Sequence, residues 1–96
     1  MNSKVDLREL NKLEQYLKQN GYEYKRIDDD QHYMCFHQLI VFKNGKRIFD
    51  VVCHLWSYGG KKGLLETMGE ITPKGEDVEG SLTAEDVIKR MKENKI

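Results

Sequence analysis

Four side chains that could do chemistry gather in one predicted hairpin in the middle of the chain. The hairpin register places Cys35, His37, Asp50 and His54 on one face of two paired strands. A thiol beside an imidazole is the start of a nucleophilic pair, and this set of residue types could also ligate zinc. No Cys-x-x-Cys spacing supports zinc, and antiparallel sheets often leave one face partly exposed. We therefore predict no catalytic residue, no metal and no cofactor, and keep a Cys/His enzyme or zinc site as the third alternative.

A glycine-rich, aromatic loop follows the hairpin and is the predicted binding surface. It carries Trp56, the only tryptophan, and Tyr58, followed by Lys61 and Lys62. Aromatic anchors beside basic residues are typical of protein-binding hot spots, and they also suit base stacking with phosphate contacts. The glycine spacing matches neither a P-loop nor a dinucleotide fingerprint. The alternative is a connector whose aromatic rings pack back onto the core.

Three consecutive carboxylates, Asp28, Asp29 and Asp30, precede the hairpin. Hard cations prefer such oxygen ligands, but the glycine and the distal glutamate of a calcium loop are missing at the needed spacing. We predict a solvated turn here.

The predicted hairpin is the element that would position Cys35, His37, Asp50 and His54. Asn44-Gly45 between two runs rich in aromatic and β-branched residues is typical of a two-residue turn. An unbroken ladder from this turn pairs Lys43 with Lys46 and Ile40 with Phe49. Side chains alternate between the two faces of a strand. The predicted core face is therefore Phe36, Gln38, Ile40, Phe42, Phe49, Val51 and Cys53. The opposite face is Cys35, His37, Leu39, Val41, Ile48, Asp50, Val52 and His54.

The remaining elements follow from caps and periodicity. A capping box of Asp6 and Glu9 and a leucine stripe predict a helix over 6–20, and a strand is expected over 22–27. A short helix is expected from near residue 60 to 69, an irregular loop over 70–80, and a last helix capped by Thr83 and Asp86. The predicted fold is α+β: a helix, a three-stranded antiparallel meander, then two helices packed on one sheet face.

Length and composition indicate one globular domain over 1–96, with 33% charged and 39% apolar residues and no net charge. No apolar run approaches the roughly 20 residues of a membrane span, and the start lacks the hydrophobic stretch of a signal peptide. We expect a cytoplasmic protein with both cysteines as free thiols.

The helix–three strands–helix order resembles the topology of the double-stranded-RNA-binding domain over about residues 6–70. His32 and Lys61-Lys62 stand in the places that meet a minor groove and phosphates in that family. This resemblance implies nucleic acid as a partner.

A second resemblance covers nearly the whole chain. The stretches that carry it are 6–14 (DLRELNKLE), 37–42 (HQLIVF), 57–59 (SYG), 63–69 (GLLETMG) and 82–88 (LTAEDVI). They resemble a family of small uncharacterised proteins from phages and prophages of Gram-positive bacteria. The resemblance implies a phage accessory protein and no particular activity. The predicted function is a non-catalytic binding module for a host protein, with nucleic acid as the alternative and no role at a membrane.

Overall fold

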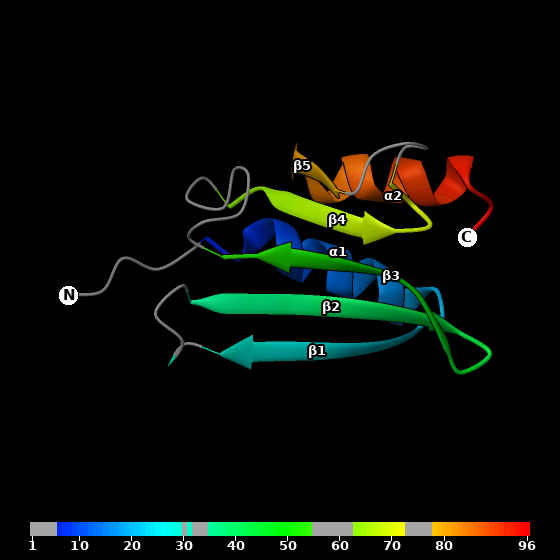
Figure 1. Ribbon diagram of the computed structural model, residues 1–96, viewed down its shortest axis with the longest axis horizontal. Coiled ribbons are helices and arrows are strands. Elements are labelled where there is room, and N and C mark those ends of the chain that lie inside the picture. The colour runs from blue at the N-terminus through cyan, green and yellow to red at the C-terminus, as the bar shows by residue number, and fades with distance from the viewer. Residues whose placement is uncertain (1–5, 30, 32–34, 55–62, 73–77) are drawn as a thin grey trace.

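The computed structural model describes residues 6–29, 31, 35–54, 63–72 and 78–96. Its elements are helix α1 (Arg8–Gln19), strands β1 (Glu23–Asp29), β2 (Phe36–Lys43), β3 (Lys46–Cys53), β4 (Leu65–Gly69) and β5 (Val78–Leu82), and helix α2 (Ala84–Glu93). The five strands form one antiparallel sheet in sequential order (Figure 1). The α+β class is confirmed, as are the first helix, the first strand and the hairpin. The order of elements after β3 differs from the prediction.

Strand β4 lies where a helix was predicted over 60–69. Leu65 and Thr67 are fully buried, whereas Glu66 and Met68 are only partly buried. This two-residue period is that of a strand with one face on the core. The segment has good intrinsic helix formers, so the prediction was wrong because pairing with β3 overrides local propensity.

Strand β5 lies in the segment predicted as an irregular loop, and it pairs with β4 across a register shift. Ser81 adopts a positive φ of 58° within it. Polar and apolar residues hardly alternate in a strand of only five residues with this irregularity. The sequence therefore lacks the pattern by which a strand is recognised.

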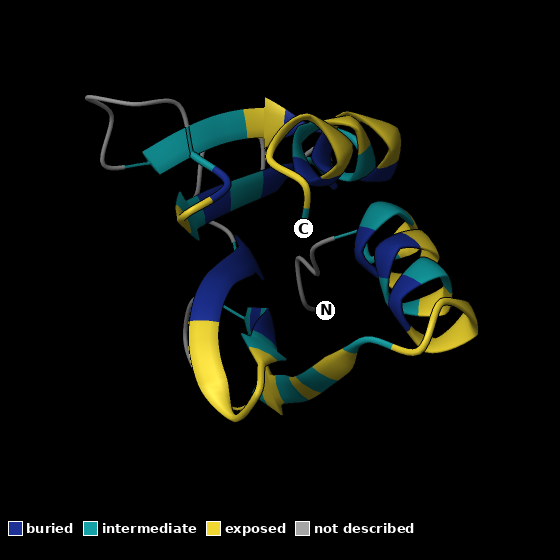
Figure 2. Ribbon diagram, turned by 90° about the vertical axis from the view of Figure 1, so that its right-hand side faces the viewer, coloured by how far each residue is buried: buried dark blue, intermediate teal, exposed yellow. Residues whose placement is uncertain are grey.

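Both helices cover the same face of the sheet (Figure 2). The predicted leucine stripe of α1 is confirmed, because Leu10, Leu13 and Leu17 are fully buried. They join one hydrophobic cluster with residues of α2 and of the sheet, among them Leu39, Val41, Phe49, Val51, Leu65, Val87 and Met91. The two helices on this face are α1 and α2, whereas the prediction placed there the last helix and a helix over 60–69, where β4 forms instead. Neither described helix is long and apolar enough to cross a membrane.

The hairpin turn forms as predicted, but the register changes inside the hairpin. Asn44 and Gly45 have φ values of 54° and 78°, as a type I′ turn requires, and Lys43 pairs with Lys46. A β-bulge then shifts the pairing by one residue, so that Val41 rather than Ile40 pairs with Phe49.

The bulge decides which side chains face the helices. The predicted core face is right for β3, where Phe49, Val51 and Cys53 are buried in the core, and wrong for β2. On β2 the helix-covered face consists of His37, Leu39 and Val41. Two consecutive β3 residues, Ile48 and Phe49, both enter the core, which unbroken alternation does not allow.

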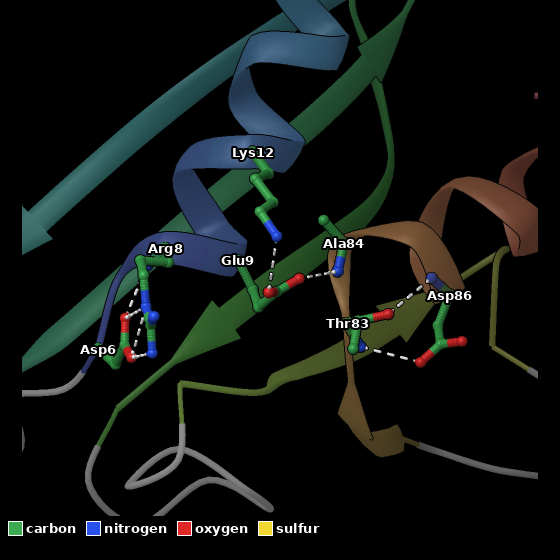
Figure 3. Close-up of polar contacts among 7 residues, drawn as sticks. All are labelled: Asp6, Arg8, Glu9, Lys12, Thr83, Ala84 and Asp86. Carbon is green, nitrogen blue, oxygen red and sulfur yellow. Dashed lines mark hydrogen bonds and ion pairs between the residues drawn. The ribbon is translucent and has the colours of Figure 1, made fainter.

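The N-terminus of α2 has the predicted capping box. The Thr83 hydroxyl accepts a hydrogen bond from the Asp86 backbone N–H, and the Asp86 carboxylate accepts one from the Thr83 backbone N–H (Figure 3). Two of the unpaired donors at a helix start are satisfied in this way.

The predicted capping box of Asp6 and Glu9 is wrong, although both carboxylates bind backbone. Asp6 accepts from the backbone N–H of Arg8 and pairs with its guanidinium at 2.6 Å. Glu9 reaches the other helix, where its Oε1 accepts from the Ala84 N–H at 2.8 Å, while its Oε2 pairs with Lys12 at 3.3 Å (Figure 3). The first-turn carboxylate of α1 therefore caps α2, because α2 brings an unpaired N–H within reach.

Candidate functional site

The four residues Cys35, His37, Asp50 and His54 do not share a face. His37 is on the helix-covered face with 1% of its surface exposed, and Cys35 packs against the core. Asp50 and His54 are on the opposite face, where the His54 ring stacks on Phe36 with ring centroids 5.7 Å apart. The bulge is the reason, because it exchanges the faces of β2 relative to β3. Among residues 6–29, 31, 35–54, 63–72 and 78–96, no group of three or more His, Cys, Asp or Glu side chains could hold a metal ion.

A different alignment of chemical groups appears on the helix-covered face. Asp28, His37 and Cys53 are cross-strand neighbours on β1, β2 and β3. His37 Nδ1 lies 2.7 Å from Asp28 Oδ1. Burial raises the pKa of Asp28, but hydrogen bonds from His37 and Arg26 outweigh it and leave the pKa below its ordinary value. An ionised carboxylate therefore orients the imidazole, as in a cysteine–histidine–aspartate triad.

Cys53 lacks the reactivity that such a triad needs. Its side chain is fully buried, and its Sγ donates to the backbone carbonyl of Asp6 at 3.8 Å. Burial raises the pKa of the Cys53 thiol to about 11. The nucleophile in cysteine chemistry is the thiolate, which is scarce at neutral pH with this pKa. The bonds of these side chains join β1 to β2, through Asp28 and His37, and β3 to the segment before α1, through Cys53.

Thiol reactivity tests this assignment. Both cysteines are free, as predicted, so the unfolded protein should give two reactive thiols without prior reduction. In the folded protein we expect Cys53 to be protected, because its thiol is buried and protonated. Titration of a Cys35→Ser variant with a thiol reagent isolates Cys53. Rapid modification of that variant under native conditions would contradict the assignment.

The sheet face away from the helices is the second place where side chains gather. We call it the outer face, and it consists of Glu23, Lys25, Ile27 and Asp29 of β1, Phe36, Gln38, Ile40 and Phe42 of β2, Arg47, Asp50 and Val52 of β3, Glu66 and Met68 of β4, and Val78 of β5. Figure 2 shows that both helices lie on the other side of these strands. Neither described helix therefore covers the outer face.

Asp50 is the fixed polar centre of the outer face. Only 3% of its surface is exposed. Gln38 Nε2 donates to its Oδ2 at 2.7 Å, and Arg47 pairs with its Oδ1 at 3.0 Å. A buried carboxylate is stable when its oxygens are bonded in this way. Asp50 thus fixes two neighbouring side chains in place on the sheet.

Apolar side chains surround this polar centre. Ile40 and Val52 are buried beside it, while Phe36, Phe42 and Met68 keep part of their surface exposed. Aromatic residues, methionine and arginine are enriched in protein–protein interfaces. Preorganised polar groups among partly exposed apolar ones are therefore a composition suited to binding a protein surface.

The residues predicted for binding from the sequence, Trp56, Tyr58, Lys61 and Lys62, lie outside the described residues. Asp30 does as well. The other two carboxylates of its run, Asp28 and Asp29, belong to the end of β1 rather than to a turn, so the predicted turn begins too early.

A cavity of about 260 Å³ lies at the hairpin end of the sheet. Its lining includes Tyr22, Phe42 and Ile48. The volume is below the usual range of small-molecule pockets, so it can take a single side chain and not a cofactor-sized ligand.

Comparisons with protein-family models, with curated proteins and with solved structures find no match to this chain. Its function must therefore be inferred from the residues and their geometry.

Proposed function

We propose that this protein is a non-catalytic binding module that binds another protein through the outer face of its sheet. The observation that carries the proposal is the set of partly exposed side chains, Phe36, Phe42 and Met68, around the fixed Asp50. The resemblance to small phage and prophage proteins favours a host protein in the host cytoplasm as the partner. We propose a non-catalytic role because the Cys53 thiol is buried and burial raises its pKa.

Nucleic acid is the alternative partner, and the charge of the outer face favours protein over it. Four carboxylates, Glu23, Asp29, Asp50 and Glu66, lie on that face against two basic residues, Lys25 and Arg47, and Arg47 is already paired with Asp50. On the exposed side of α1, Arg8 and Lys12 are likewise paired with carboxylates. A phosphate backbone is bound by basic groups free to replace its counterions. Binding through Trp56 and Tyr58 of the loop belongs to this alternative as well.

Capture and affinity measurements test the proposal. A tagged protein should capture a specific partner from host lysate, and the purified pair should bind in a titration. Phe36→Ser and Met68→Ser should each weaken that binding at least tenfold, because partly exposed anchors contribute about 2 kcal/mol when they are buried in an interface. Lys18→Ser, on the exposed side of α1, is the control and should bind like the wild type.

Three outcomes contradict the proposal in different ways. Unchanged affinity of both outer-face variants would remove the outer face as the site. Loss of binding by Trp56→Ala alone would move the site to the loop over 55–62. Capture that disappears on nuclease treatment, with affinity falling steeply as salt rises, would indicate the nucleic-acid alternative.

A further inference from the structure

Strand β1 is a regular edge strand of the sheet that the described residues form. It pairs with β2 over seven consecutive residues without a register shift. No other described strand pairs with its second edge, and β1 forms the border of the sheet in Figure 1. The opposite edge is different, because β5 has five residues, a register shift and a positive φ at Ser81. Long regular edges are the ones that can accept a further strand.

Within β1, the charges of residues 25–29 reverse sign about Ile27. Lys25 and Arg26 precede Ile27, and Asp28 and Asp29 follow it. Charged edge strands normally block pairing with other chains. In an antiparallel arrangement of two identical strands centred on Ile27, however, each basic residue lies opposite an acidic residue of the other copy.

We propose that β1 pairs with β1 of a second copy of this chain, antiparallel and with Ile27 on the twofold axis. Lys25 then faces the partner copy's Asp29 on the outer face, and Arg26 faces its Asp28 on the helix-covered face. Each of these pairs occurs twice by symmetry. The product is a continuous ten-stranded sheet with all four helices on one side.

The charge pattern selects this register over its neighbours. A shift of two residues in either direction keeps the helices on one side but places Arg26 opposite Arg26, or Asp28 opposite Asp28. Like charges directly opposite each other destabilise a sheet, whereas opposite charges stabilise it. Asp28 remains accessible for the pairing, because 45% of its side chain is exposed. Arg26 uses Nε and Nη1 for its contacts with Asn11, Glu14 and Asp28 of its own chain, and 16% of its side chain remains exposed.

The mass of the wild-type protein in solution gives the first test. In analytical ultracentrifugation, the average mass should rise with concentration from 11.3 kDa toward about twice that value. An edge-to-edge contact is small, so we expect a reversible dimer rather than an obligate one. A wild-type protein that stays monomeric up to about millimolar concentration would overturn the proposal.

Charge reversal tests the register. Lys25→Glu and Asp29→Lys each replace two attractive pairs by repulsive ones, and each should weaken dimerisation about tenfold or more. Mixed in equal amounts, the two variants should form a heterodimer as tight as the wild-type dimer, since every pair between them is again opposite in sign. This restoration also excludes unfolding as the cause of the loss.

Lys46→Glu is the matched control, because it makes the same charge change in the hairpin, away from β1. It should dimerise like the wild type. A dimer that is unaffected by Lys25→Glu, or a mixture that fails to associate, would overturn the pairing centred on Ile27. The proposed binding of another protein is measured separately, with Phe36→Ser and Met68→Ser, so that failure of the β1 pairing and failure of that binding can be told apart.

Discussion

Gly69→Ala should lower the free energy of unfolding by about 3 kcal/mol. Gly69 ends β4 with a φ of 111°, a conformation that side chains rarely adopt. A Cβ built at this position would lie 2.7 Å from the backbone carbonyl oxygen of Ile48 and from Cα of Phe49. These backbone atoms belong to the bulge of β3, which is also held by a hydrogen bond from the Glu70 N–H to Ile48 O. Because these neighbouring atoms are backbone, they cannot easily move away from an added Cβ.

Gly21→Ala is the control for this prediction. Gly21 also has a positive φ, of 72°, but no atom lies within 4 Å of an added Cβ. It should therefore show the backbone strain alone, about 1 kcal/mol. Urea unfolding of both variants, followed by circular dichroism, measures the difference. If Gly69→Ala and Gly21→Ala lowered the free energy of unfolding by the same amount, the close contact between Gly69 and the bulge of β3 would be ruled out as a cause of destabilisation.

Phe49→Ala should destabilise the protein by about 4 kcal/mol, enough to unfold much of it if the wild type has ordinary stability. Phe49 is among the largest fully buried side chains, and it belongs to the cluster that joins both helices to the sheet. Truncation removes its burial and leaves a cavity that close-packed neighbours cannot fill completely.

Phe36→Ala makes the same chemical change on the outer face. Phe36 is partly exposed and its ring stacks on that of His54, so we expect a loss of about 1 kcal/mol. Chemical denaturation of the two variants compares the two faces of the sheet directly. A loss at Phe36 as large as that at Phe49 would mean that the outer face is part of the core and is not available to a partner.

Local signals in the sequence were enough to predict several elements. The helix predicted over 6–20 follows from a leucine stripe, and the structure has a helix over 8–19 that buries Leu10, Leu13 and Leu17. The Asn44-Gly45 turn and the Thr83–Asp86 capping box depend on residues a few positions apart, and both form as predicted. Patterns of this kind are reliable because the physics that favours them acts within one turn of helix or one hairpin.

The candidate site could not be predicted in the same way. Cys35, His37, Asp50 and His54 come together only if pairing continues unbroken from the turn, and the bulge at Ile48 ends that continuity. The β2 sequence does carry one signal of its outer face. Strand β2 is apolar on both faces: Phe36, Ile40 and Phe42 lie on one face, and Leu39 and Val41 lie on the other. A strand of this kind has apolar side chains on the face away from the helices as well as in the core.

By itself the sequence determined the first helix, the cap of the last helix, the hairpin turn and the sign reversal of charge along β1. Each of these depends on residues that are close together in the sequence. The tertiary structure alone decided that residues 65–69 form a strand, that β2 presents His37 rather than Gln38 to the helices, and that Glu9 caps α2. The reason is that sheet pairing and helix docking satisfy backbone groups far apart in the chain, and the energy of these long-range contacts exceeds the small differences in local propensity.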